Sequence, residues 1–243
     1  MPESGVPHAG SFLTANWQSL AMLNYEVPHA VLRPFVPEGT ELDTFEGITS
    51  ASMVGFLFLD TRVLGLAIPF HRDFEEVNLR FYVRRRAPEG WRRAVVFIKE
   101  IVPKRGIAAI ARTVYGENYV RLPMRHHRDR VEVGYEWLVG GRWNGLHVRI
   151  CGEPALPAAG SAEEFITEHY WGYTAQRRGA AKEYRVEHVP WRVWQVDEAA
   201  LICDAEYLYG AGFAEALSEP PRSAFLAEGS PITVYRADRI ALP

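Results

Sequence analysis

Residues 75–86 carry the pattern that most restricts how this chain folds. Their sequence, EEVNLRFYVRRR, alternates apolar and polar side chains, which is the two-residue period of a β-strand. The two faces differ: the apolar face holds Val77, Leu79, Phe81 and Val83, and the polar face holds Glu76, Asn78, Arg80 and Tyr82. A strand of this kind packs one face on an apolar core, so the pattern predicts a fold built from β-sheets.

The rest of the chain repeats this signal in short pieces. The 16 prolines and 20 glycines are spread along all 243 residues, which indicates many short elements joined by turns. We predict a mainly β fold with a few helices and, since no break in composition divides the chain, a single domain over residues 1–243. Further strands are expected in 14–27, 94–102, 124–152, 184–196, 200–209 and 231–240, and helices in 28–35, 104–116 and 161–170.

Charge and hydropathy exclude several classes of protein. The chain has 27 Lys and Arg against 30 Asp and Glu, a net charge of −3, so there is no electrostatic reason to expect nucleic acid or an anionic membrane as a partner. No apolar run approaches the roughly 18 residues that span a membrane, and the N-terminal sequence lacks the pattern of a secretory signal. We therefore expect a soluble, cytoplasmic protein that binds neither nucleic acid nor membrane.

Standard motifs for cofactors and metals are missing from the sequence. It contains no GxGxxG after a strand, no GxxxxGK[ST], no HExxH and no GxSxG, so nucleotide-binding folds lack support. Cys151 and Cys203 have no metal-binding spacing and are expected to be buried free thiols. We expect no cofactor and no metal.

Amine chemistry has few candidates in this chain. Lys99, Lys104 and Lys182 are the three lysines among the 27 basic residues. An amine becomes a nucleophile when desolvation or a neighbouring cation lowers its pKa. Lys99 alternates with Val95 and Phe97, so its stem shares an apolar face, but the strand ends nearby and its amine is expected to be solvated. Lys104 begins an exposed helix and Lys182 lies in a polar loop, so the sequence favours solvated lysines over a catalytic one.

Several polar groups allow two interpretations. Glu76, Asn78 and Arg80 form either a polar cluster inside a barrel that binds a ligand, or a charged face turned to solvent. His169 and His188 form either a metal or acid–base site, if the helix and strand that carry them meet, or two hydrogen-bonded structural groups. The adjacent His126 and His127 are interpreted as part of a solvated basic turn.

A set of ordered segments resembles one known family. In sequence order they are FLTANWQSLAMLNYEVPHAVLRPFVPEGTELDTFEG, EVNLRFYVRR, VVFIKEIVPKRGIAAIARTVYGENYVRLPM, FITEHYWGY and VEHVPWRVW. Together they resemble the YqjF-like family of uncharacterised bacterial proteins, DUF2071, over residues 12–238. The resemblance implies the fold of acetoacetate decarboxylase, which is a cone-like, mainly antiparallel β-barrel with an internal pocket and a few short helices.

The same resemblance identifies a difference from acetoacetate decarboxylase itself. The glutamate-bearing strand of that enzyme is similar to residues 75–77 here, and its short helix to residues 111–116. Its two adjacent lysines would then fall at Tyr119 and Val120, neither of which has an amine. We therefore expect that this chain is not a decarboxylase of the Schiff-base type.

The resemblance also suggests what the pocket binds. If the fold is kept, the polar residues expected to line the pocket and bind the ligand are Glu76, Arg80, Arg112, Tyr119 and Arg121. Buried arginine beside glutamate must be paired or must bind an anion, so a small keto or enol carboxylate is the expected ligand. Glu76 is the candidate base and Tyr119 the candidate proton donor.

Three functional classes remain open at this point. The chain is either an enzyme that uses acid–base chemistry without lysine, or a non-catalytic protein that binds a small carboxylate, or a structural protein that builds oligomers. Its 12% aromatic content allows apolar interface patches, so a homo-oligomer is compatible with the sequence.

Overall fold

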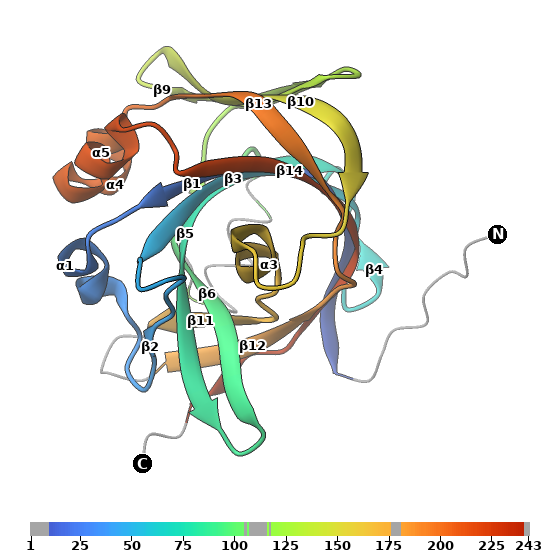
Figure 1. Ribbon diagram of the computed structural model, residues 1–243. Helices are drawn as coiled ribbons and strands as arrows, with labels where there is room; N and C mark the ends of the chain where they lie inside the picture. Colours follow the sequence, from blue (N-terminus) through green and yellow to red (C-terminus); the bar gives the residue numbers. More distant parts are fainter. Residues whose placement is uncertain (1–9, 105, 107–115, 117, 176–180, 241–243) are drawn as a thin grey trace.

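The computed structural model of the chain describes residues 10–104, 106, 116, 118–175 and 181–240 (Figure 1). Most of these residues lie in β-strands, and the helices are few and short. The predicted mainly β fold is therefore confirmed. No helix in the described ranges is both long and apolar enough to cross a lipid bilayer.

Seven of the described strands close into a ring. Each is hydrogen-bonded to the next, and the last pairs back with the first. In order around the ring they are β1 (Ser11–Glu26), β3 (Ser50–Val63), β5 (Phe74–Ala87), β6 (Gly90–Val102), β11 (Trp171–Ala175), β12 (Ala181–Glu187) and β14 (Ser223–Tyr235). Their pairings are antiparallel except between β6 and β11, which run parallel.

A second layer of strands continues from β14 and covers one side of the ring (Figure 1). Its strands are β13 (Val193–Ile202), β10 (Arg142–Ala155), β9 (Glu132–Val139) and β8 (Met124–Arg128). The layers approach closely at Gly55 of β3, where an added Cβ would lie 2.6 Å from the ring of Tyr135. The Tyr135 hydroxyl then donates to the carbonyl of Ser19, 2.8 Å away. A glycine at position 55 is thus what lets β9 lie on the ring.

Short elements connect these layers. The short strands are β2 (Glu41–Leu42), β4 (Leu66–Ala67), β7 (Tyr119–Arg121) and β15 (Asp238–Arg239). The helices are α1 (His29–Leu32), the 3-10 helix η1 (Arg33–Phe35), α3 (Ala162–Thr167), α4 (Ala205–Tyr209) and α5 (Ala211–Ser218). Figure 1 looks into the ring and shows α3, in gold, at its centre. Ser161 caps α3 by accepting from the Glu164 amide at 3.2 Å, as its sequence position predicts.

The strand that gave the clearest sequence pattern is buried on both faces. Val77 and Leu79 are part of the apolar core between the ring and the outer layer. Glu76, Asn78 and Arg80 face the interior of the ring and are 2%, 1% and 7% exposed. The interpretation of this polar face as solvent-facing is therefore wrong, because the ring closes over it.

Three other expectations need correction, and one cannot be assessed. His126 and His127 are exposed, as expected, but they lie in strand β8 and not in a turn. Residues 200–209 were expected to form a strand, but β13 ends at Ile202 and α4 begins at Ala205, because the Asp204 side chain accepts from the Tyr207 amide and caps a helix. Cys151 is a free thiol but is exposed rather than buried. The helix expected over 104–116 lies almost entirely outside the described residues.

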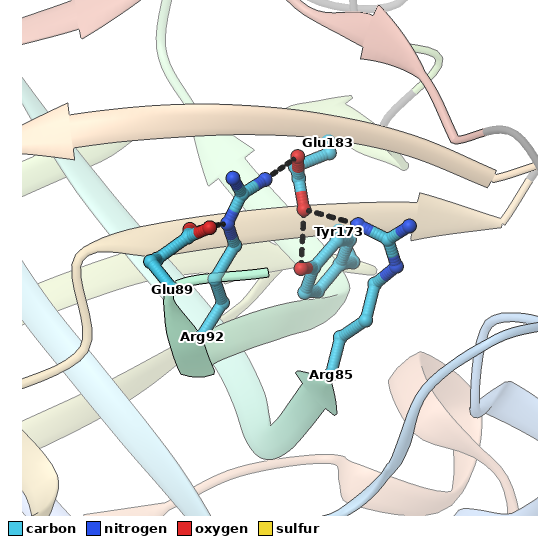
Figure 2. A network of polar contacts seen from close by, with 5 residues as sticks. All are labelled: Arg85, Glu89, Arg92, Tyr173 and Glu183. Carbon is cyan, nitrogen blue, oxygen red and sulfur yellow. Dashed lines mark hydrogen bonds and ion pairs between the residues drawn. The ribbon is translucent and has the colours of Figure 1, made fainter. Parts of the chain in front are cut away.

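A polar network fastens the ring at one of the two places where its strand pairing is shortest, the β6–β11 and β12–β14 ladders. The β6–β11 ladder has two residue pairs, and Figure 2 shows the contacts beside it. The carboxylate of Glu183 on β12 accepts from Arg85 at 3.4 Å, from the Tyr173 hydroxyl at 2.5 Å and from Arg92. Arg92 also donates to Glu89 at 2.5 Å. These contacts join the β5–β6 hairpin to β11 and β12.

Candidate functional site

A cavity inside the ring is the candidate site. The centre of a water molecule can move through about 100 Å³ of it. Its walls are mostly apolar and rich in aromatic rings; the aromatic lining residues are Phe12, Trp17, Phe56, Phe58, Phe74, Phe97, Trp171, Tyr184 and Trp191. Polar groups also reach it, namely Glu76, Asn78, Arg80, Glu100, Tyr119, Thr167, His169 and His188. Apolar walls with a small set of converging polar groups are typical of small-molecule sites.

Glu76 is held by two neighbours in the cavity wall. Asn78, two residues along β5, donates to Glu76 Oε1 at 2.9 Å. The Tyr119 hydroxyl donates to Glu76 Oε2 at 3.2 Å, since β7 runs parallel to β6 and brings Tyr119 beside the ring. Burial raises the pKa of Glu76 to about 7, although both hydrogen bonds and Arg80 oppose this shift. Its carboxyl group is therefore suited to exchange protons near neutral pH.

Arg80 brings a buried positive charge to the same wall. No ion pair joins it to a carboxylate anywhere in the described part of the chain. Its Nη2 lies 3.8 Å from the sulfur of Met22, and its Nε has no hydrogen-bond acceptor among those residues. Arg80 lowers the pKa of the nearby Glu76, but it forms no direct ion pair with it. Because burying a charge without a direct partner is costly, this guanidinium favours an anion in the cavity.

His169 follows α3 and is backed by two charged residues. Its Nε2 lies 3.5 Å from Asp43 Oδ2, and Arg93 donates to the same oxygen at 2.8 Å. Burial lowers the pKa of His169 to about 4, despite the opposing effect of Asp43. Burial alone would raise the pKa of Asp43, but the nearby His169 and the hydrogen bond from Arg93 hold it below its usual value. The imidazole in the wall is therefore neutral at pH 7.

His188 lies at the end of β12 and is fixed by stacking. Its ring packs on Trp191 with centroids 4.2 Å apart and on Tyr170 at 4.7 Å. Its Nδ1 lies 2.9 Å from the carbonyl of Val189, which can only accept, so the ring proton is on Nδ1 and Nε2 keeps a lone pair. Burial lowers the pKa of His188. This residue is a further hydrogen-bond acceptor in the cavity wall.

The structure brings together most of the residues that were singled out from the sequence. Glu76, Arg80 and Tyr119 line the cavity, and His169 and His188 line it too, although they lie on different elements. Arg121 is exposed, donates to the Pro103 carbonyl at 3.2 Å and is not a lining residue. Arg112 lies outside the described residues. The ligand-binding roles of all these residues remain predictions.

The three lysines lie away from the cavity lining. Lys99 has its pKa lowered by burial, but its amine donates to the carbonyl of Leu208 on α4, outside the ring. Neither Lys104 nor Lys182 contributes to the wall. Since the whole sequence has three lysines, an amine in this cavity would require a rearrangement of the described side chains.

Sequence reasoning missed Asp43 and Trp17. Asp43 follows the two-residue strand β2, and it reaches His169 because β2 pairs with β5. Trp17 lies within an apolar strand, where nothing in the local pattern distinguishes a cavity wall from a filled core. Both positions depend on contacts between distant segments, which periodicity does not report.

Comparisons with known proteins give one matching family and one matching fold. The model of the family DUF2071, described as an uncharacterized conserved protein, matches residues 14–231. The uncharacterized protein YqjF of Bacillus subtilis (strain 168) is 28% identical over 193 residues, which cover 76% of each chain.

Two solved structures are similar across nearly the whole chain. Acetoacetate decarboxylase from Legionella pneumophila superposes with a TM-score of 0.70 at 11% identity, covering 99% of this chain and 92% of the enzyme. The enduracididine biosynthesis enzyme MppR, solved with pyruvate, superposes with a TM-score of 0.66 at 14% identity, covering 98% and 93%. At such low identity these likenesses show a shared fold.

Proposed function

This chain belongs to the DUF2071 family and has the acetoacetate decarboxylase-like fold, and we propose that its cavity binds a small keto or enol carboxylate and moves a proton on it without a lysine. The observation that carries this proposal is Arg80, a buried guanidinium in the cavity wall with no carboxylate partner in the ranges described. A ligand carboxylate would supply the missing negative charge through a charge-assisted hydrogen bond.

The fold relatives support a keto carboxylate over other anions. MppR was solved in complex with pyruvate, which is a 2-keto carboxylate. The low identity transfers no activity to this chain. It makes keto carboxylates the first compounds to test, because their acid group suits Arg80 and their carbonyl oxygen suits a hydroxyl donor such as Tyr119.

Proton transfer is assigned to Glu76 in this proposal. Its carboxylate takes a proton from the carbon beside the ligand's keto group. The C–H electron pair then forms the C=C bond of the enolate, and the carbonyl π pair moves onto oxygen. Arg80 stabilises that oxygen by hydrogen bonding, and the Tyr119 hydroxyl, released by the protonation of Glu76, turns its one proton to the same oxygen. Return of the proton from Glu76 completes the exchange. A pKa of about 7 for Glu76 keeps both of its forms available near neutral pH.

The proposal excludes an imine. The positions that resemble the lysine pair of the decarboxylase are Tyr119 and Val120, and the described cavity wall contains no lysine. Without an amine there is no covalent electron sink for losing CO₂ from a 3-keto acid. Enolisation needs no such sink, because the keto oxygen itself accepts the electron pair.

Binding is tested with a matched pair of arginine variants. Pyruvate titrated into the wild-type protein should bind, and Arg80→Gln should weaken that binding by about 100-fold, as expected for loss of a buried charge-assisted contact of roughly 2–3 kcal/mol. Arg121→Gln is the control, since Arg121 is exposed and outside the wall; it should bind like wild type. Equal binding by both variants would contradict the proposal, and so would a wild-type protein that binds no keto carboxylate.

Turnover is tested separately, so that an enzyme can be told from a binder. Proton NMR in D₂O should show that the wild-type protein exchanges the methyl protons of pyruvate for deuterium, and that Glu76→Gln does not. Treatment with borohydride should leave no adduct on any lysine. Tight binding without exchange would support the non-catalytic alternative, and a trapped lysine would contradict the proposed mechanism.

A further inference from the structure

The cavity wall on β1, β3 and β5 can be described as rows, each row being the residues that are paired across these adjacent strands. Polar and aromatic side chains lie in different rows. Asn78 is paired with Val54, which is paired with Met22, and the Arg80 guanidinium contacts Met22. Two residues along the same strands, Glu76 is paired with Phe56. The guanidinium of Arg80 therefore lies at the row of Asn78, Val54 and Met22. This row is two residues along the strands from the row that contains Glu76.

The next row, on the other side of Glu76, is aromatic. Trp17 is paired with Phe58, which is paired with Phe74. Phe58 stacks on Phe74 with centroids 4.8 Å apart, and Trp17 meets Phe58 edge-on at 5.7 Å. Because residues advance about 3.3–3.4 Å each along a strand, this row lies roughly 13 Å from the row that holds the guanidinium.

Phe56 connects the row of Glu76 with the aromatic row. It lies in the row of Glu76 and meets Trp17 edge-on at 5.3 Å. In addition, the Nε1 proton of Trp17 is buried and has no hydrogen-bond acceptor among the residues described, and the face of an aromatic ring is a weak acceptor for such a donor. The aromatic row thus offers ring surfaces against which an aromatic group of a ligand can pack, and the Trp17 Nε1 proton as a donor to the face of that group.

The available space is larger than pyruvate needs. The centre of a water molecule can occupy about 100 Å³ of this cavity, well above the roughly 10–15 Å³ that is enough to hold one water. A three-carbon keto acid that contacts Arg80 and Glu76 would leave the aromatic row untouched.

From this arrangement we infer that the carboxylate ligand carries an aromatic group. Its acid group lies on Arg80, its reacting carbon lies at Glu76, and its ring lies against Trp17 and Phe58. The inference rests on the proposed function and adds a substrate class to it: 2-keto carboxylates with an aryl substituent on the third carbon. It also assigns to Trp17 and Phe58 the selection of that substituent.

Titration of pyruvate and phenylpyruvate into the full-length protein tests this inference. Wild type should bind phenylpyruvate about 10- to 100-fold more tightly than pyruvate, as expected for burial of a phenyl group. Trp17→Leu should lose about tenfold in affinity for phenylpyruvate and stay within about twofold for pyruvate. Trp91→Leu is the control, since Trp91 is 47% exposed and outside the wall; it should behave as wild type.

The outcomes separate the two proposals. Equal affinity of wild type for both compounds, or equal losses for both in Trp17→Leu, would overturn the aromatic substrate class and leave the keto-carboxylate site in place. Failure of both compounds to bind wild type would overturn the proposed function itself. If Trp17→Leu does not fold, Phe58→Leu is measured in its place, and the wild-type ratio decides in either case.

Discussion

Glu76 and His169 line one cavity, and burial moves their pKa values in opposite directions. It raises the pKa of Glu76 to about 7 and lowers that of His169 to about 4, because in each case the uncharged form is favoured. The contribution of Glu76 to stability is complete below pH 4.5 and is lost as the pH rises to 7. The contribution of His169 is complete above pH 6.5 and is lost as the pH falls to 4. The two effects offset each other in the wild-type protein.

Replacing Glu76 should reveal this balance. Glu76→Gln keeps the shape of the protonated side chain but cannot ionise. We expect it to be close to wild type in stability near pH 4.5 and more stable than wild type at pH 8, by on the order of 3 kcal/mol. Urea unfolding at both pH values measures the difference.

The exposed Glu132 provides the matched control for that measurement. Its side chain is 46% exposed, so Glu132→Gln should change stability little at either pH. A Glu76→Gln variant that differs from wild type by the same amount at pH 4.5 and pH 8 would show that Glu76 has no raised pKa in the folded protein.

At the same scale, the sequence predicts some site residues and not others. The two-residue period places Glu76, Asn78 and Arg80 on one face of a strand, and that arrangement is found. The period cannot say whether the face meets water or a cavity, because the answer depends on the strands that close the ring. Asp43 and Trp17 escaped prediction for the same reason.

Among the elements, β6 and β11 form one of the two joints of the ring that have the shortest ladder. Their parallel ladder has two residue pairs, and the network around Glu183 lies beside it (Figure 2). Glu183 is 12% exposed and contacts two arginines whose side chains are 22% and 21% exposed. The carboxylate thus compensates two partly buried positive charges at the joint.

Removal of this carboxylate should therefore weaken the whole ring. We expect Glu183→Ala to lower the free energy of unfolding by about 2 kcal/mol, because it leaves Arg85 without its partner and Arg92 with the exposed Glu89 alone. Glu132→Ala, which removes an exposed ion pair with Arg149, should cost less than about 1 kcal/mol. Thermal and urea unfolding compare the two variants, and equal losses would contradict a special role for Glu183.

Elements with strong local signals were predicted well, and those with competing signals were not. Ser161 and Glu164 have the spacing of a helix cap, and α3 begins there. Residues 200–209 have the apolar composition of a strand, but the cap provided by Asp204 begins a helix within them. Local composition alone could not decide between the two.

At the scale of the whole molecule, the space between the two layers and the space inside the ring are filled differently. The space between the ring and the outer layer is filled by apolar side chains. The interior of the ring holds a second apolar cluster, but polar groups from β5, β7 and the segment after α3 also reach it and leave a cavity. The closed ring thus holds Glu76 and Arg80 on β5, and β7, which pairs with β6, places Tyr119 beside them, so that the candidate site is built on strands.

A crystal structure of the protein with phenylpyruvate tests the central claim most directly, because it shows both the position and the bonding of the ligand. We predict the carboxylate on the guanidinium of Arg80, the third carbon within reach of the Glu76 carboxylate, the ring against Trp17, and no covalent bond to the protein. An empty cavity at saturating ligand, or a ligand bound covalently to a lysine, would contradict the account.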